Sequence, residues 1–284
     1  MTDDDWRVTR FENAGAFLER AEGFLTRNEA QNCVLLGLAT QQLPTFMAVV
    51  TGGEEIAGAA VMTPHHNLIL AMCEAPGAIA ALAADAHNFL AQIPGVVAPV
   101  PISNWFADAW AAVSGDEIAV SLSERLYQLT RVRPLRPVGG RARRAVESDR
   151  AVLHAWLTDF EIEALGERPT DVDGHIDSIL TVPRRGMYLW EVDGQPVSLA
   201  GFVGPTPHGI RIGPVYTPPA LRGRGYASAC VARLSQDMLD GGRTHCFLYT
   251  DLTNATSNHI YQEIGYEPVC DVAVYRFTQP VAPA

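Results

Sequence analysis

The sequence predicts a mixed α/β protein made of two halves, each with a sheet flanked by helices. Two observations carry this prediction. A connector rich in proline and glycine divides the 284 residues into near-equal halves. Both halves alternate segments of helical periodicity with short apolar runs of strand length, and the order of elements in the first half repeats in the second.

The connector is the stretch 131–140, which holds two prolines and a glycine pair. Such a composition is typical of a linker between domains. At ~100–200 residues per domain, the chain length also fits two domains. We therefore expect a first domain over residues 1–134, a linker over 135–140 and a second domain over 141–284.

The first half begins with helical periodicity over residues 11–39. Apolar runs of strand length and two further periodic segments follow. The expected elements are strands at 46–50, 56–62 and 68–73, a helix at 76–91, a strand at 96–100, a helix at 103–113 and a strand at 125–131.

The second half opens with an amphipathic helix, whose apolar residues recur at helical spacing between Asp149 and Gly166. A hairpin signal, Asp193-Gly194, joins the next two apolar runs. The further expected elements are strands at 187–192, 197–203 and 210–216, a helix at 227–240 ended by Gly241, a strand at 245–250, a helix at 256–264 closed by Gly265 and a strand at 269–277.

Composition excludes several kinds of chemistry. All 21 basic residues are arginine, so the chain offers no Schiff-base lysine, no pyridoxal phosphate anchor and no phosphate-binding loop that ends in lysine. The formal net charge of −11 opposes a nucleic-acid partner, because affinity for nucleic acid rests largely on basic groups that neutralise phosphates.

No apolar run approaches the ~18 residues that cross a bilayer, and the acidic start lacks the basic and apolar regions of a signal peptide. We therefore expect a cytoplasmic protein outside the membrane. The five cysteines include no CxxC pair, so we interpret them as buried, reduced thiols and expect no metal. The pair His65-His66 fits a turn or the surface better than a metal site, because neighbouring strand residues point to opposite faces.

The loop between the expected strand at 210–216 and the expected helix at 227–240 carries the chemistry. A strand that leads through a loop into a helix with small first-turn residues gathers unpaired backbone N–H groups at the positive end of the helix dipole. Gly223 and Gly225 allow close approach of a ligand to the backbone, and arginines lie beside them. The loop therefore predicts a phosphate or pyrophosphate site. A dinucleotide fingerprint would need a third glycine where Ser228 stands.

The pattern Arg222-x-x-Gly225-x-Ala227 resembles the acyl-CoA signature of the GCN5-related N-acetyltransferase (GNAT) superfamily. The stretch 251–266 is similar to the Asn, Ser/Ala and Tyr pattern of that family, which ends in a glycine-aromatic pair. The resemblance implies tandem GNAT-like domains, each a central, mostly antiparallel sheet flanked by helices. Because the corresponding loop of the first half, 75–78, lacks the Arg/Gly run, the first domain would be a degenerate copy.

The resemblance also implies roles for the residues of the second half. Acetyl-CoA would be the cosubstrate, and Tyr261 would donate a proton to its departing thiolate, as a phenol that is protonated at neutral pH can do. Backbone groups of Val215, Tyr216 and Thr217 would hold the pantetheine arm. The pyrophosphate would contact Arg222, Gly223, Arg224, Gly225, Tyr226 and Ala227, while Asn254 and Ser257 would line the pantetheine side; Asn254 and Ser257 could instead serve only as turn and cap groups, and Tyr261 as a core residue.

The general base departs from the better-known family pattern. Some members place a glutamate eleven residues before the Arg222 position, and this chain has Arg211 there, which cannot accept a proton. The candidates that remain open are Glu161 and Glu163 at the end of the first helix, His208 before the strand, and a chain of water molecules.

The resemblance favours an N-acetyltransferase in which a neutral amine attacks the thioester directly, and the chain has no GxSxG nucleophile elbow. The alternative is a non-catalytic, regulatory acyl-CoA-binding protein, which Arg211 supports. The acceptor would be a small-molecule or peptide amine, and the chain a monomer or homodimer. Acceptor contacts would lie in 161–181, whose acidic residues suit a cationic amine or simply a solvated loop: Glu161, Glu163, Glu167, Asp171 and Asp173.

Overall fold

The computed structural model describes residues 6–40, 44–166 and 168–280. Its internal contacts form two compact units that are discontinuous in sequence. Unit 1 holds the chain up to Leu126, the segment Tyr249–Thr253 and the chain from Pro268 onward. Unit 2 holds Tyr127–Leu248 and Asn254–Glu267. None of the helices in the described part of the chain is long and apolar enough to cross a membrane.

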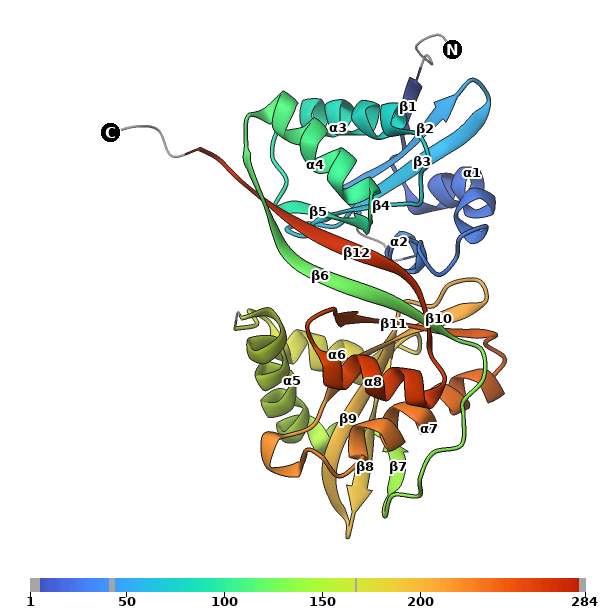
Figure 1. Ribbon diagram of the computed structural model, residues 1–284, viewed down its shortest axis with the longest axis vertical. Coiled ribbons are helices and arrows are strands. Elements are labelled where there is room, and N and C mark those ends of the chain that lie inside the picture. The colour runs from blue at the N-terminus through green and yellow to red at the C-terminus, as the bar shows by residue number, and fades with distance from the viewer. Residues whose placement is uncertain (1–5, 41–43, 167, 281–284) are drawn as a thin grey trace. The chain divides into compact units, whose positions relative to one another are not determined.

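Unit 1 is a sheet with helices on both faces (Figure 1). The strand order within it is β1-β2-β3-β4-β5-β12-β6, and β4 and β5 run parallel. Its elements are β1 (Trp6–Arg10), α1 (Ala14–Thr26), α2 (Cys33–Ala39), β2 (Phe46–Gly52), β3 (Glu55–Met62), β4 (Leu68–Leu70), α3 (Pro76–Leu90), β5 (Gly95–Pro99), α4 (Ile102–Ser114), the greater part of β6 (Glu117–Leu129) and nearly all of β12 (Glu267–Thr278).

Alternation along β2 shows why this sheet needs two helical layers. Phe46, Ala48 and Val50 pack in the core under α3 and α4, whereas Met47 and Val49 pack in the core under α1 and α2. Successive strand residues point to opposite faces, so a continuous apolar run must be covered on both sides. The periodic stretch expected at 11–39 therefore forms two helices, α1 and α2, on one face.

The last strand of the chain belongs mostly to unit 1. β12 pairs antiparallel with β5, from Val272 opposite Pro99 to Arg276 opposite Gly95. Arg125 of β6 forms a two-bond ion pair with Asp271 of β12, at 2.7 and 3.1 Å. The expected division at residues 134 and 141 assigns this strand to the second domain, so the structural units and the expected domains differ there. A linear boundary cannot describe a strand that pairs far from its sequence neighbours.

Unit 2 repeats the arrangement with the order β11-β10-β9-β8-β7. β10 and β11 run parallel, and the other pairs are antiparallel. Its elements are β7 (Arg141–Arg144), the 3-10 turn η1 (Glu147–Asp149), α5 (Arg150–Leu165), α6 (Val172–Thr181), β8 (Gly186–Val192), β9 (Gln195–Val203), β10 (Gly209–Tyr216), the 3-10 turn η2 (Pro219–Leu221), α7 (Tyr226–Asp240), most of β11 (His245–Asp251) and α8 (Ala255–Ile264).

Two remaining expectations concern cysteines and histidines. Four cysteines are buried and Cys270 is only half-buried, and none of the five forms a disulfide. The expectation of full burial is therefore wrong for Cys270. His65 and His66 are exposed in the turn between β3 and β4, where His65 has a φ of 64°. Among the described residues, no group of three or more His, Cys, Asp or Glu side chains could hold a metal ion.

Candidate acyl-CoA site

β10 loses its parallel neighbour partway along its length. The register with β11 covers Gly209 to Arg211. On the other side, the pairing with β9 shifts between Ile212 and Val215. This bulge turns Tyr216 into the core under α5 and α6, although Ile210 and Ile212 face the core under α7 and α8. The second half of β10 therefore presents a strand edge whose polar groups can meet a ligand.

The carbonyl groups at the end of β10 are partly engaged by side chains. Ser198 Oγ donates a hydrogen bond to the Tyr216 carbonyl oxygen at 3.1 Å. Arg222 Nε donates to the Thr217 carbonyl oxygen at 2.8 Å. Val215 and Tyr216 also pair with β9. We expected the backbone of Val215 to Thr217 to hold a pantetheine arm. The pairing with β9 and these side-chain bonds leave the edge that faces β11 for such contacts.

The loop after β10 leads directly into the N-terminus of α7. Gly223 and Gly225 have φ values of 73° and 80°, which glycine adopts without the steric cost of a side chain. Gly225 is the N-cap of α7, and no side chain caps this end. The first hydrogen bond of the helix is donated by the Ala229 N–H to the Gly225 carbonyl oxygen, at 3.0 Å. The N–H groups of the first turn therefore point out of the helix, as an anion site requires.

The two arginines of this loop hydrogen-bond within unit 2. Besides Thr217, Arg222 contacts Glu163 of α5, with Nη2 at 2.6 Å from Oε2. This bond raises the pKa of Arg222 above its ordinary value. Arg224 Nη2 donates to the Ala220 carbonyl at 3.3 Å. The guanidinium of Arg222, which we expected to bind phosphate, is thus engaged by protein groups.

The second motif forms the start of α8. Asn254 is the N-cap, and its Oδ1 accepts a hydrogen bond from the Ser257 backbone N–H at 3.0 Å. Asn254 and Ser257 therefore lie together at one helix end, and Asn254 at least has a capping role. Its carbonyl also accepts from Asn258 Nδ2 at 2.8 Å.

Tyr261 lies two turns further along α8, in the core beneath α7 and α8. The side chain is 8% exposed, and its ring meets that of Tyr266 edge-on at 6.0 Å between centroids. Burial raises the pKa of Tyr261 to about 12. The phenol is therefore protonated at neutral pH and able to donate a proton. The structure therefore places Tyr261 in the core of unit 2.

Three carboxylates on α5 have different surroundings. Glu163 pairs with Arg222. Glu161, whose pKa is raised by burial, is two residues away, which is ~200° around a helix, so it lies on a different face. Asp159 lies one turn before Glu163 on the same face, and its Oδ2 accepts a hydrogen bond from Tyr216 Oη at 3.4 Å. We did not single out Asp159 from the sequence, although its i,i+4 spacing from Glu163 was a visible signal.

The candidate base His208 and the departure from the family pattern, Arg211, both lie away from the end of β10. His208 precedes β10, so at ~3.3 Å per residue it lies roughly 26 Å along the strand from Tyr216. Arg211 lies on the paired half of β10, and its charge contributes to a lowered pKa of Arg185, whose main cause is burial. Neither side chain is near the end of β10 where the loop begins.

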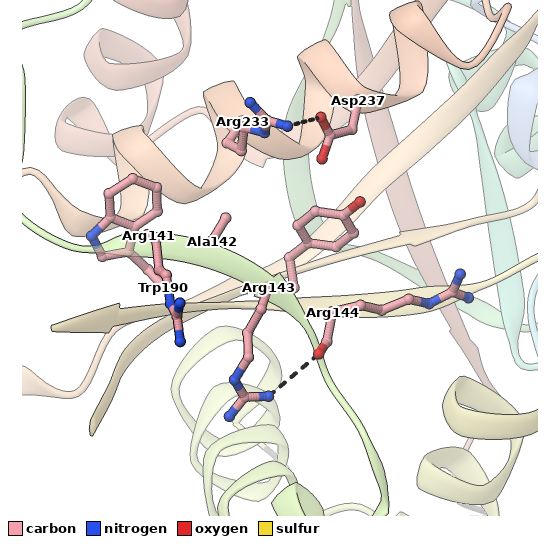
Figure 2. Close-up of a pocket in the computed structure, with 8 residues that line it drawn as sticks. Arg141, Ala142, Arg143, Arg144, Trp190, Arg233 and Asp237 are labelled. Carbon is pink, nitrogen blue, oxygen red and sulfur yellow. Dashed lines mark hydrogen bonds and ion pairs between the residues drawn. The ribbon is translucent and has the colours of Figure 1, made fainter. Parts of the chain in front are cut away.

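Two cavities lie away from this loop. Figure 2 shows the larger one, of about 450 Å³, between the edge strand β7, β8 and α7. Its arginines are largely satisfied, because Arg143 binds Asp149 and Glu191 and Arg233 binds Asp237. The second cavity, of about 280 Å³, lies at the α5–α6 connection, where acceptor contacts are expected. Of the acidic residues expected there, Asp171 and Asp173 line it, and Glu167 lies outside the described residues.

Comparisons with known proteins agree with this geometry. Residues 150–266 match the model of the Acetyltransferase (GNAT) family, a range that includes both motifs. No curated protein sequence matches the chain. Similar solved structures include a GCN5-related N-acetyltransferase from Kribbella flavida, with 16% identity and a TM-score of 0.63 over 90% of this chain and 96% of that chain.

Two other solved structures extend over nearly the whole chain. A GCN5-related N-acetyltransferase from Sphaerobacter thermophilus has 15% identity and a TM-score of 0.63 over 99% of this chain and 98% of that chain. A tandem GNAT protein from the clavulanic acid biosynthesis pathway has 14% identity and a TM-score of 0.59 over 98% and 100%. These similarities confirm the expected fold class of tandem GNAT-like domains. The family match identifies residues 150–266, which hold both motifs, as a GNAT acetyltransferase domain.

Proposed function

We propose that the protein transfers an acetyl group from acetyl-CoA to an amine nitrogen, in unit 2. The observation that carries this proposal is the uncapped N-terminus of α7 directly behind the unpaired end of β10. A strand edge suits the amides of a pantetheine arm, and a helix N-terminus suits a pyrophosphate. The strand edge and the helix N-terminus follow one another in the chain, as the pantetheine arm and the pyrophosphate follow one another in CoA.

The backbone supplies most of the cosubstrate contacts in this proposal. The N–H groups of Gly223 to Ala227 bind the pyrophosphate, and the β11-facing edge of Val215 to Thr217 holds the pantetheine arm. Asn254 and Ser257 line the same arm from α8, in addition to the cap that they form. The described residues at the corresponding junction of unit 1 are less open, since a Cβ on Gly77 in the first turn of α3 would lie 2.6 Å from Trp6 Nε1.

The reaction is a direct attack of a neutral amine on the thioester. A C–N bond forms at the acetyl carbonyl carbon, the C–S bond breaks, and the thiolate leaves. Tyr261, which burial keeps protonated, donates the proton that the thiolate takes up, and the proton removed from the amine returns through solvent to the Tyr261 phenolate. Asp159 is the α5 carboxylate beside Tyr216 with no arginine partner among the described residues, so we assign it removal of the amine proton, directly or through water.

Calorimetric titration with acetyl-CoA, followed by CoA-thiol release with a panel of small amines and peptides, tests the proposal. We expect a dissociation constant of roughly 100 μM or tighter, about −5.5 kcal/mol, and thiol release with at least one amine. Binding without release on the whole panel would favour the non-catalytic acyl-CoA-binding protein that Arg211 in β10 supports. No binding of any acyl-CoA would exclude both functions.

A further inference from the structure

Helix α5 contacts both ends of the strand-loop junction through two carboxylates one turn apart. Asp159 Oδ2 accepts from Tyr216 Oη at 3.4 Å, and Glu163 Oε2 accepts from Arg222 Nη2 at 2.6 Å. Trp156, on the same side of the helix, meets the Tyr216 ring at 6.3 Å between centroids. One face of α5 thus contacts both the last residue of β10 and the arginine of the loop.

Arg222 connects this helix to the loop backbone. Its Nε donates to the Thr217 carbonyl at 2.8 Å while its Nη2 binds Glu163. The guanidinium carbon lies 5.7 Å from the centre of the Tyr216 ring, within the range of a cation–π contact. Because Thr217 and Arg222 bracket residues 218–221, these bonds close the loop that ends at Gly225. A guanidinium is planar and presents its donors in a fixed fork, so holding one edge orients the other.

We propose that Glu163 is a positioning residue, which fixes the acyl-CoA loop through Arg222 and so couples acyl-CoA binding to the position of α5. The proposal rests on the proposed function, because it concerns the same loop. Glu163 itself contacts neither the acyl-CoA nor the amine. Acyl-CoA that binds to the loop also fixes the position of α5, and the amine then binds best to the acyl-CoA complex.

This role makes a prediction of opposite sign to simple electrostatics. A carboxylate near a site for a polyanion repels the ligand, so removing its charge should strengthen CoA binding. If Glu163 positions the loop, removing its charge weakens CoA binding instead, because Arg222 no longer holds Thr217 in one orientation. The sign of the change in affinity therefore distinguishes the two effects.

A double-mutant cycle on the dissociation constant of CoA, measured by calorimetry on the full chain, tests the coupling. We expect Glu163→Gln to weaken binding about threefold to fivefold, as suits a half-exposed ion pair. Arg222→Ala should weaken it about tenfold, and Glu163→Gln should add nothing in the Arg222→Ala background. Glu147→Gln is the matched control, because Glu147 of η1 accepts an equally short 2.6 Å bond from Arg150, the first residue of α5. Unchanged or tighter binding by Glu163→Gln, or fully multiplicative effects, would overturn the proposal.

Hydrogen exchange separates this proposal from the proposed function. In the protein without ligand, we expect the amides of 217–225 to exchange faster in Glu163→Gln than in the wild type and in Glu147→Gln. With CoA present, exchange in α5 should slow in the wild type and not in Glu163→Gln. If the wild type binds no CoA, the proposed function is wrong, and exchange without ligand still decides the role of Glu163. Equal exchange in all three proteins would refute that role.

Discussion

The two units have the same strand-to-helix junction, but they differ in how far the N-terminus of the helix is exposed. In unit 1 the parallel pairing of β4 with β5 covers only Leu68 and Ile69, and in unit 2 that of β10 with β11 covers only Gly209 to Arg211. Both strands then lead to a helix without a side-chain N-cap bond. The fold alone therefore produces the short parallel pairing and the exposed helix end.

The loop sequence decides whether that end is open. In unit 1, Pro76 at the start of α3 has no N–H to offer, and a Cβ on Gly77 would lie 2.6 Å from Trp6 Nε1. In unit 2, Gly225 adopts a positive φ, no side chain caps the helix, and a Cβ on Gly225 would meet the tip of Val138, 3.0 Å from its Cγ2, in place of an aromatic ring. A repeated fold can therefore keep its geometry in both copies even where the N–H groups at one helix N-terminus have been removed or covered.

Gly225→Glu should have the largest effect, because it makes the open junction resemble the closed one. The new side chain meets a φ of 80° that only glycine adopts easily, and it places a carboxylate at the proposed anion site. We expect acetyl-CoA binding to fall by about 100-fold or more in calorimetry. The control is Gly166→Glu, at a C-cap with a φ of 73° and open space around it, which imposes a similar backbone cost elsewhere. A similar loss of acetyl-CoA binding in both variants would mean that Gly225→Glu acts by destabilising the protein in general.

Tyr261→Phe should reduce acetyl transfer by about 10-fold to 100-fold and leave the dissociation constant of acetyl-CoA within twofold. Because the pKa of Tyr261 is about 12, its phenol stays protonated as pH rises to 9. The ratio of wild-type to variant rates should therefore be constant between pH 6 and 9. The control is Tyr266→Phe, which removes an equally buried hydroxyl that bonds Ser235 at 2.8 Å. Tyr266→Phe should lower the free energy of unfolding and leave the rate of acetyl transfer nearly unchanged. Equal rates of acetyl transfer in the wild type and Tyr261→Phe would show that Tyr261 takes no part in the reaction.

Trp6→Ala tests the closed junction. Removing the indole uncovers Gly77 but leaves Pro76 in place, so we expect no acetyl-CoA binding in unit 1. This is measured in the Gly225→Glu background, where unit 2 contributes none. Stability should fall by about 1–3 kcal/mol in chemical denaturation, because a half-buried aromatic side chain is lost from the core. Recovered binding would show that the indole alone closes unit 1.

The sequence predicted the parts of the site that are local in the chain. Gly223, Gly225 and Asn254 lie in short motifs, and each takes the backbone or capping role that its residue type favours. The contact of Glu163 with Arg222 joins residues 59 apart. No pattern in either segment specifies it, because it depends on how α5 packs against β10.

The fold was predictable to a similar degree. Long periodic segments predicted the helices other than α6, together with the central strands, and the matching order of elements predicted the two halves. The strands β1 and β7, of five and four residues, lacked a strand signal, since both are rich in arginine and lie at sheet edges. The placement of β12 beside β5 was missed for another reason, because a strand's pattern says that it pairs but not with which partner.

The first strands of the two units, β1 and β7, differ in the ion pairs that their arginines form. In unit 2, Arg143 binds Asp149 and Glu191, two carboxylates with less than a tenth of their side chains exposed. Among the described residues of unit 1, Arg10 forms its ion pair with Asp85, whose side chain is 23% exposed. The hydrogen bond from Arg143 lowers the pKa of Asp149 below its ordinary value. Its stabilisation is therefore complete above the ordinary pKa of aspartate, near ~3.9, and is lost as pH falls through the lower folded-state value.

Asp149→Asn should accordingly cost about 1 kcal/mol at pH 7 and progressively less as pH falls below ~4. Asp85→Asn is the matched control and should change stability less at every pH, because Arg10 is more exposed than Arg143. Urea unfolding at a series of pH values, read by tryptophan fluorescence, measures both. Since Trp190 lies in unit 2 and Trp110 in unit 1, single-tryptophan variants assign each transition to its unit. An equal loss in both variants would mean that the ion pairs of the two first strands contribute alike, and that the two units differ in their loops alone.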